Sequence, residues 1–202
     1  METPDIVWAT PLYEFLRQCS AAPLLRRVLD CGAGGSDSPV QLFHQYGYRT
    51  CGIDIQAEAV RRAACFCRDN GVPLGIFLGD MRSIPFASES FGAVFSFNAI
   101  WFMTKPDTAR AVREMERGLR PGGLCYVNFV SADDPNRRPF ADDAYARRLL
   151  SSEQFADHED DEAESYFHDL VILRKEKRWM DKVHGGGRLL QVYTDYIARK
   201  GD

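Results

Sequence analysis

Short apolar segments alternate with amphipathic helical segments along most of this 202-residue chain, and the alternation constrains the fold more than any other feature. Strands are predicted where apolar residues run together, and helices where apolar residues recur at helical spacing. The predicted strands are residues 26–31, 49–55, 74–78, 91–97 and 124–130, and the predicted helices are residues 5–19, 38–46, 57–69 and 106–119. Strands and helices that alternate in this way build βαβ units around a parallel sheet with helices on its faces.

The end of the chain departs from the alternation. Residues 171–179 and 189–198 both predict strands, and the turn His184-Gly185-Gly186-Gly187 lies between them. Two strands joined by a short glycine-rich turn indicate a hairpin, which adds an antiparallel strand to the sheet. We therefore expect an α/β fold with a doubly wound, mostly parallel seven-stranded sheet and an antiparallel terminal hairpin strand, in a single domain over residues 1–202.

Two segments outside the alternation are expected to cover a site at the sheet edge. Residues 1–25 are predicted to form an N-terminal helical segment with apolar residues at helical spacing. Residues 131–166 form a polar, acidic insert after the strand 124–130, and we expect short helices and loop there. Long segments beyond the carboxyl ends of strands are usually functional, so the insert is predicted to be a lid over an acceptor site.

Composition excludes some classes of protein. The net charge is −4 and no half of the chain is strongly basic, which argues against broad nucleic-acid binding. No apolar run approaches the roughly 18 residues that suggest a membrane span, and the N-terminus lacks the basic region of a signal peptide. Six cysteines without a secretion signal are expected to be reduced thiols, which favours a cytoplasmic protein.

A glycine-rich loop directly follows the first predicted strand, in the sequence Val28-Leu29-Asp30-Cys31-Gly32-Ala33-Gly34-Gly35-Ser36. Glycines allow positive φ and let the backbone approach a ligand closely. In doubly wound sheets, ligands bind beyond the carboxyl ends of the strands where the strand order reverses. The loop therefore predicts a ligand site, although a glycine-rich loop alone does not specify the ligand.

Two carboxylates follow later strands. Asp54 ends the second strand about 20 residues beyond the loop, where an acid can accept hydrogen bonds from both ribose hydroxyls of a nucleoside. The alternative role for Asp54 is to cap the helix 57–69. Asp80, in Gly79-Asp80-Met81 after the third strand, can accept the exocyclic amine of adenine, or it can simply stabilise a turn.

These motifs, in this order, resemble class I S-adenosylmethionine-dependent methyltransferases, and most closely the small stand-alone members of the methyltransferase-11 type. The resemblance rests on five segments, which are residues 28–34, 52–54, 79–86, 91–94 and 114–123. The Leu119-Arg120-Pro121-Gly122-Gly123 segment, predicted to turn before the strand 124–130, is the most family-specific piece.

The resemblance implies S-adenosylmethionine as the cofactor and assigns a role to each matching residue. Asp30 and the backbone of Gly32, Ala33 and Gly34 would hold the methionine part of the cofactor. Ser36 stands where the family has its third loop glycine, with Gly35 one place early, so the path of the loop is expected to differ there.

The adenosine part would be held by the later motifs. Asp54 would accept the ribose hydroxyls and Ile55 would pack on adenine. Asp80 would accept the adenine amine, and Met81 would line the other face of the base. The segment Asn98, Ala99 and Ile100, just past the fourth strand, would close over the methionine moiety.

The implied reaction is an SN2 transfer of a methyl group from a sulfonium, for which a protein mainly supplies proximity and alignment. Aromatic groups stabilise such a cation, so Trp101 and Phe102 after the fourth strand are candidate contacts, with lid or core packing as the alternative. Trp8 and Tyr13, before the first strand, are candidate contacts to cofactor or acceptor. No catalytic residue is assigned, and no metal site is predicted.

The predicted function is therefore a methyltransferase that acts on an unidentified, small-molecule acceptor without binding a membrane. Two alternatives remain open. The chain can be a non-catalytic S-adenosylmethionine-binding regulatory protein, because methyl transfer needs no invariant catalytic residue. It can also be an NAD-dependent dehydrogenase, because a glycine loop followed by Asp54 suits any ribose-bearing dinucleotide.

Overall fold

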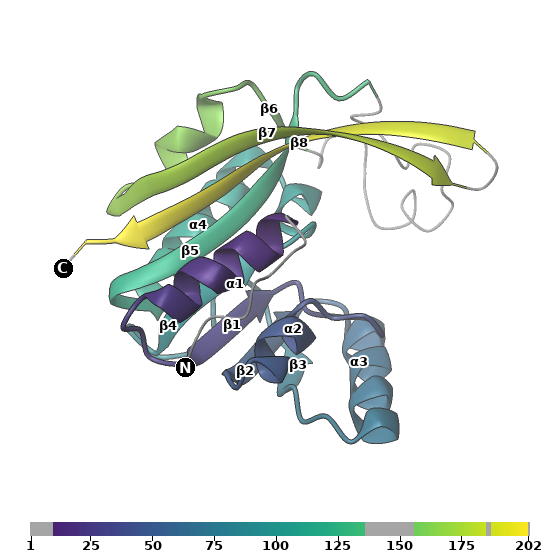
Figure 1. Cartoon of the computed structure of the whole chain (residues 1–202), viewed down its shortest axis with the longest axis vertical. Coiled ribbons are helices and arrows are strands. Elements are labelled where there is room, and N and C mark those ends of the chain that lie inside the picture. Colours follow the sequence, from purple (N-terminus) through teal and green to yellow (C-terminus); the bar gives the residue numbers. More distant parts are fainter. Residues whose placement is uncertain (1–9, 136–155, 185–186, 202) are drawn as a thin grey trace.

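The computed structural model describes residues 10–135, 156–184 and 187–201, with the side chains of residues 182–184 and 187–189 excepted (Figure 1). In this part of the chain, eight strands form one sheet in the order β3-β2-β1-β4-β5-β8-β7, with β6 paired to β5. The strands β1 (Arg27–Cys31), β2 (Arg49–Asp54), β3 (Ile76–Leu78), β4 (Phe91–Ser96) and β5 (Leu119–Ser131) are parallel. The predicted doubly wound α/β fold is confirmed.

The strand order reverses between β1 and β4. The chain leaves β1 for β2 and β3 on one side, and β4 then returns to the other side of β1. The connections after β1 and β4 therefore diverge at the carboxyl ends of these strands and leave a crevice between them. The glycine-rich loop leaves β1 at this point, directly after Cys31.

Helices cover both faces of the sheet. One face carries α1 (Pro11–Ala21), α2 (Val40–Gln45) and α3 (Ala57–Asn70). The other carries α4 (Lys105–Gly118) and the 3-10 turn η2 (Glu162–Tyr166), while the turn η1 (Ile100–Phe102) follows β4. The core is thus split into two apolar layers by the sheet.

Local sequence explains how α1 and α4 begin and how α1 packs. Pro11 occupies the first turn of α1, where a missing N–H costs nothing. Leu12, Phe15, Leu16 and Cys19 recur on one face and are buried against the sheet. Each such side chain contributes about 1.5 to 3 kcal/mol on burial, so α1 is firmly attached to the sheet. Helix α4 is capped by Thr104, which accepts a hydrogen bond from the Asp107 amide at 3.3 Å.

The predicted hairpin is confirmed and is longer than the sequence indicates. β7 (Leu170–His184) pairs with β8 (Gly187–Lys200), and β8 lies antiparallel between β7 and β5. The β5–β8 ladder covers only Tyr193 to Arg199 of β8. The rest of the hairpin extends past β5, as Figure 1 shows.

The insert contributes an eighth strand that the sequence does not predict. β6 (Asp157–His158) pairs with the end of β5, and the acidic residues that follow it contact lysines of β7. Lys175 lies 2.5 Å from Asp161 and 2.7 Å from Glu164, and Lys177 lies 2.5 Å from Asp160. Residues 156–166 are therefore docked on the sheet; the expected lid otherwise falls largely on residues 136–155, outside the described residues.

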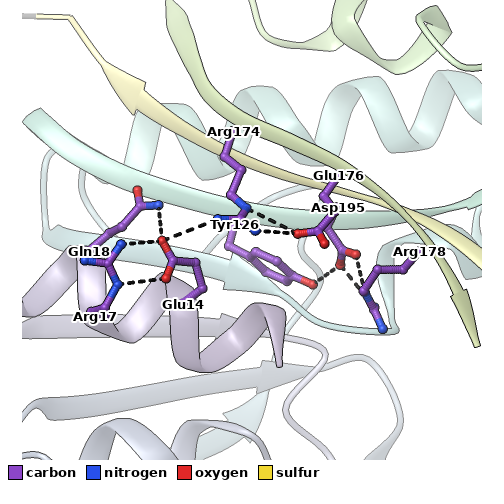
Figure 2. A network of polar contacts seen from close by, with 8 residues as sticks. All are labelled: Glu14, Arg17, Gln18, Tyr126, Arg174, Glu176, Arg178 and Asp195. Atoms are coloured by element: carbon purple, nitrogen blue, oxygen red, sulfur yellow. Dashed lines mark hydrogen bonds and ion pairs between the residues drawn. The ribbon is translucent and has the colours of Figure 1, made fainter. Parts of the chain in front are cut away.

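A polar network joins α1 to the terminal hairpin (Figure 2). The Tyr126 hydroxyl donates to Asp195 Oδ1 at 2.5 Å, and Arg178 Nε donates to Asp195 Oδ2 at 2.5 Å. The Asp195 side chain is 5% exposed. Closer to the surface, Glu14 accepts hydrogen bonds from Arg17 and Gln18 and lies 3.7 Å from Arg174.

Two local predictions are wrong. The Pro121-Gly122-Gly123 segment lies within β5, where the register to β4 shifts between Phe91 and Ala93, and does not form a separate turn before the strand. The predicted helix 38–46 begins only at Val40, and the Ser38 hydroxyl donates to Asp30 Oδ2 at 3.4 Å. Among the described helices, none is long and apolar enough to cross a membrane.

Candidate functional site

A cleft of about 450 Å³ opens at the carboxyl ends of the parallel strands, where the strand order reverses. Loops after β1, β2, β3 and β4 line it together with the first turns of α3 and α4. The lining residues are Gly32, Gly34, Ile53, Asp54, Ile55, Gln56, Ala59, Arg62, Gly79, Asp80, Met81, Arg82, Asn98, Ala99, Phe102, Met103, Thr104 and Asp107. The volume lies in the range of small-molecule and cofactor sites.

Asp54 lies at the end of β2 and holds two neighbouring segments. Its Oδ2 accepts the Gly34 amide at 2.9 Å, and its Oδ1 accepts the Gln56 amide at 2.8 Å. A carboxylate offers about four lone-pair positions, so about two remain, one on each oxygen. Those two positions match the two hydroxyls of a ribose. Both roles weighed from the sequence are thus compatible, because Asp54 supports the start of α3 and keeps capacity for a ligand.

The glycine loop packs closely and uses its own amide hydrogens. Gly32 and Ala33 donate to Ile53 O at 2.8 and 3.0 Å, and Gly35 donates to Ala59 O at 2.9 Å. With Gly34 bound to Asp54, four successive amides are satisfied within the protein. A Cβ on Gly34 would lie 2.5 Å from Asp54 Oδ2 and from Ala59 Cβ, so glycine is required there. The loop offers a ligand close approach but few amide donors.

Asp80 is engaged by Arg82, two residues further along the chain. Arg82 Nε lies 3.0 Å from each carboxylate oxygen, and Arg82 Nη2 donates to Oδ2 at 2.7 Å. The other arm of the guanidinium, Nη1, donates to Asp107 Oδ2 at 3.0 Å, in the first turn of α4. The guanidinium beside Asp80 holds the pKa of that carboxyl below its ordinary value. Asp80 is therefore an ionised acceptor at the cleft.

Apolar side chains line the cleft beside these carboxylates. Ile55 is 60% exposed, although aliphatic side chains usually avoid water, and Phe102 is 37% exposed. Met81 and Met103 are half-buried. An exposed aliphatic side chain directly after Asp54 offers a flat base an apolar surface to pack on. This fits the role that the resemblance implies for Ile55.

The loop after β4 is fixed by a reciprocal asparagine pair. Asn98 adopts a left-handed backbone with φ 55°, and its backbone N–H donates to Asn128 Oδ1 at 2.8 Å. Asn128 Nδ2 returns a hydrogen bond to Asn98 Oδ1 at 2.7 Å. Strained backbone of this kind persists where surrounding structure holds it, often at functional sites. Sequence reasoning missed Asn128, whose signal is an amide in an otherwise apolar strand.

Most predicted cofactor residues come together in the cleft, but Asp30, Ala33 and Ile100 do not line it. All three are buried, with Asp30 only 1% exposed. Burial raises the pKa of Asp30 to about 8, and the hydroxyl of Ser38 is its side-chain partner. Direct side-chain contact of Asp30 with the methionine part stays a prediction.

Of the aromatic residues predicted as cofactor or acceptor contacts, Phe102 lines the cleft. Trp101 is 3% exposed and stacks on Phe102 with ring centroids 4.1 Å apart, so Phe102 faces the cleft and Trp101 supports it. Tyr13 is half-buried on α1 and does not line the cleft. Trp8 lies outside the described residues.

A second hollow of about 620 Å³ lies at the opposite end of the parallel strands, between the end of α1, the starts of β5 and β7 and the end of β8. It is larger than the cleft, but its lining contains Arg17, Arg199 and Lys200 and no carboxylate. Because ligands of such folds bind at the carboxyl ends of the strands, the smaller cleft is the better candidate site.

Comparison with known proteins identifies the fold and the central motifs. Residues 29–127 match the family model described as "Methyltransferase domain". The chain is 16% identical to a putative methyltransferase from Bacillus halodurans, whose crystal structure superposes with a TM-score of 0.71 over 95% of this chain and 99% of that one. This match shows the shared fold.

Curated relatives match the same region. The chain is 31% identical over 110 residues to sarcosine/dimethylglycine N-methyltransferase of Halorhodospira halochloris, covering 53% of this chain and 39% of that protein. It is 29% identical over 111 residues to a probable tRNA methyltransferase 9B of Mus musculus, covering 54% and 22%. The chain spans less than half the length of these relatives, and their named acceptors differ widely.

Proposed function

Since the chain belongs to the class I methyltransferase family, we propose that it transfers the methyl group of S-adenosylmethionine to a small-molecule acceptor. The observation that carries the proposal is the geometry of Asp54. Its carboxylate lies at the end of β2, beside the glycine loop, with about one acceptor position left on each oxygen. The ribose of the cofactor supplies two hydroxyl donors for these positions.

The glycine loop favours this cofactor over a dinucleotide. A pyrophosphate is bound by free amide hydrogens at a glycine loop and helix N-terminus. Here the amides of Gly32 to Gly35 already donate to protein acceptors. The cleft also contains three carboxylates against two guanidinium groups, which suits a sulfonium cation better than a pyrophosphate. Both observations argue against the NAD-dependent dehydrogenase.

Asp30, Gly32, Ala33 and Gly34 are proposed to surround the methionine part, together with the Asn98 loop. Phe102 lies at the cleft beside this loop, where an aromatic ring stabilises a sulfonium. The protein contributes alignment of sulfur, methyl and acceptor, because the cofactor is already activated. The acceptor is proposed to be small, since the net charge of −4 provides no broad surface for nucleic acid.

Two measurements test the proposal. Isothermal titration should show one-to-one binding of S-adenosylhomocysteine and none of NAD. Incubation with S-adenosylmethionine and a panel of amine, hydroxyl, thiol and carboxylate acceptors should then release S-adenosylhomocysteine, and Asp54→Ala should lose this release. Binding of NAD without S-adenosylhomocysteine contradicts the proposal, while tight S-adenosylhomocysteine binding without turnover on any acceptor favours the regulatory alternative.

A further inference from the structure

Arg82 connects two carboxylates across the mouth of the cleft. It follows β3 and contacts Asp80 on its own loop and Asp107 on α4, and all three residues line the cleft. About a third of each side chain is exposed. The ion pairs are thus partly shielded from water and open to a ligand on one side.

The contacts of Asp80 leave it little further capacity. Oδ1 accepts the Arg82 backbone amide at 2.8 Å, and the guanidinium donates to both oxygens from Nε and to Oδ2 from Nη2. Of about four lone-pair positions on a carboxylate, the amide and the two-pronged guanidinium occupy about three. Asp80 therefore has room for about one more donor.

Asp107 prevents the guanidinium from turning away. Arg82 Nη1 donates to Asp107 Oδ2 at 3.0 Å while Nε and Nη2 face Asp80. Asp107 lies in the capped first turn of α4, where its amide donates to Thr104. A planar guanidinium can serve both carboxylates at once, whereas a lysine ammonium lacks this fixed fork.

We propose that Arg82 is a positioning residue that fixes Asp80 as the acceptor for a single amine hydrogen and thereby sets the preference of the cleft for adenine over hypoxanthine. The inference rests on the proposed function. Adenine offers an amine donor at position 6, whereas hypoxanthine offers an oxygen that faces the carboxylate without a hydrogen between them. A fixed, ionised carboxylate rejects such an oxygen, because two acceptors would be left unpaired.

Release of Asp80 should relax this discrimination. Without Arg82 the Asp80 side chain can rotate away from the oxygen of hypoxanthine, and water can enter between them. The loss of the guanidinium also removes the main cause that holds the pKa of Asp80 down. A freed or protonated carboxyl tolerates both bases.

The test compares S-adenosylhomocysteine with S-inosylhomocysteine by isothermal titration. The wild type should prefer the adenine compound by about 30-fold, within the range expected for one mispaired polar group. Arg82→Met should reduce the ratio of the two Kd values to about threefold, and Arg82→Lys should give an intermediate ratio. Arg110→Met is the matched control: Arg110 is exposed on α4, and its charge reaches Asp80 without contact, so the wild-type ratio should persist.

Three results would overturn the inference. The first is a wild type that binds both compounds equally. The second is an Arg82→Met variant that loses affinity for both compounds by the same factor, because the ratio then stays unchanged and Arg82 merely supports the loop. The third result applies if Arg82→Met fails to fold. In that case, wild-type ratios of the two Kd values in both Asp107→Asn and Arg82→Lys would overturn the inference. Failure of the wild type to bind S-adenosylhomocysteine at all overturns the proposed function instead.

Discussion

Two carboxylates in different parts of the sheet, Asp54 at the end of β2 and Asp195 in β8, serve different purposes. Asp54 accepts two backbone amides, is half-exposed and keeps about two acceptor positions facing a cleft. Asp195 is buried and accepts hydrogen bonds from Tyr126 and from two nitrogens of Arg178, as Figure 2 shows. An accessible carboxylate with unused acceptor positions, such as Asp54, indicates a ligand site. A buried carboxylate whose acceptor positions are occupied, such as Asp195, indicates a structural role.

The largest effect on stability is expected at Asp195, whose carboxylate is buried and fully hydrogen-bonded. Asp195→Ala leaves the half-buried Arg178 guanidinium and the buried Tyr126 hydroxyl without their shared partner. Removing one member of a buried pair costs about 3 to 5 kcal/mol. Urea unfolding should show this loss. The affinity of the folded variant for S-adenosylhomocysteine should stay within about threefold of the wild-type affinity, a difference of only a few tenths of a kcal/mol.

Glu176→Ala is the matched control for Asp195→Ala. Glu176 lies directly opposite Asp195 in the β7–β8 ladder and pairs with the exposed Arg174 at 2.7 Å. Exposed pairs contribute about 0 to 1 kcal/mol, so this variant should be nearly as stable as the wild type. Equal destabilisation by both variants would contradict the distinction drawn between the buried and the exposed carboxylate.

The largest effect on binding is expected at Asp54. Asp54→Ala removes the acceptor for two ribose hydroxyls, at about 1 to 3 kcal/mol each, and should weaken S-adenosylhomocysteine binding by roughly two orders of magnitude. Asp54→Asn should do less harm, because its amide oxygen still accepts. Circular dichroism should show a retained fold in both variants. Near-wild-type affinity of a folded Asp54→Ala protein in isothermal titration would mean that the ribose lies elsewhere.

A pH-dependent loss of stability should come from His158 on β6. His158 is 3% exposed, its Nε2 lies 2.9 Å from the Tyr166 hydroxyl, and burial lowers its pKa to about 4. The unfolded chain binds a proton near pH 6.5, so the contribution of His158 to stability is full above that pH and is lost as the pH drops toward 4. The two pKa values differ by about 2.5 units, so the loss should be about 3 kcal/mol in urea unfolding.

His158→Phe should flatten this part of the stability profile, because the titrating ring is gone while the apolar contact with Phe129 can be kept. His168→Asn is the matched control for loss of an exposed histidine. A stability difference between the wild type and His158→Phe that stays constant between pH 6.5 and pH 4 would show that the folded protein accommodates a charged His158.

The smallest effect on binding is expected at Asp30, which shares features with both carboxylates. It borders the glycine loop like a ligand residue, but it is buried, and burial raises its pKa to about 8. The folded protein therefore keeps a proton that the unfolded chain loses above about pH 4, and the contribution of Asp30 to stability falls as the pH rises from 4 to 8. Because an amide cannot ionise, Asp30→Asn should remove this pH dependence and should be more stable than the wild type at pH 7.5 in urea unfolding.

The same variant addresses the predicted role of Asp30 in binding. If its carboxyl contacts the methionine part of the cofactor only through the packing of the loop, Asp30→Asn should bind S-adenosylhomocysteine nearly as well as the wild type. A tenfold or greater loss of affinity would instead assign Asp30 to the ligand-binding carboxylates, together with Asp54.

The sequence predicted the features that follow from the order of strands and loops along the chain. Strand ends, the glycine loop and the position of Asp54 follow from apolar runs and spacing, because parallel strands bring their carboxyl ends to one edge. Ile55, Met81, Asn98 and Ala99 accordingly line the cleft, and their contacts with the cofactor stay predictions. Arg82 and Asp107 were not predicted, because their pairing depends on how the loop after β3 meets the start of α4.

Contacts that depend on strand register and on packing between distant segments could not be predicted from the sequence. A bulge between Ile172 and Arg174 shifts the register of β7 and thereby decides that Arg178 meets Asp195. Glu116 on α4 is only 8% exposed, because the segment before β7 and the C-terminal end of β8 cover this part of the helix. Burial raises the pKa of Glu116.

The most direct test of the central claim is a crystal structure of the protein with S-adenosylhomocysteine. The account predicts that each ribose hydroxyl lies about 3 Å from a different oxygen of Asp54, a normal hydrogen-bond distance, while the Gly34 and Gln56 amides keep their bonds to the same carboxylate. A nucleoside bound in the hollow of about 620 Å³ at the opposite end of the strands, with Asp54 untouched, would contradict it.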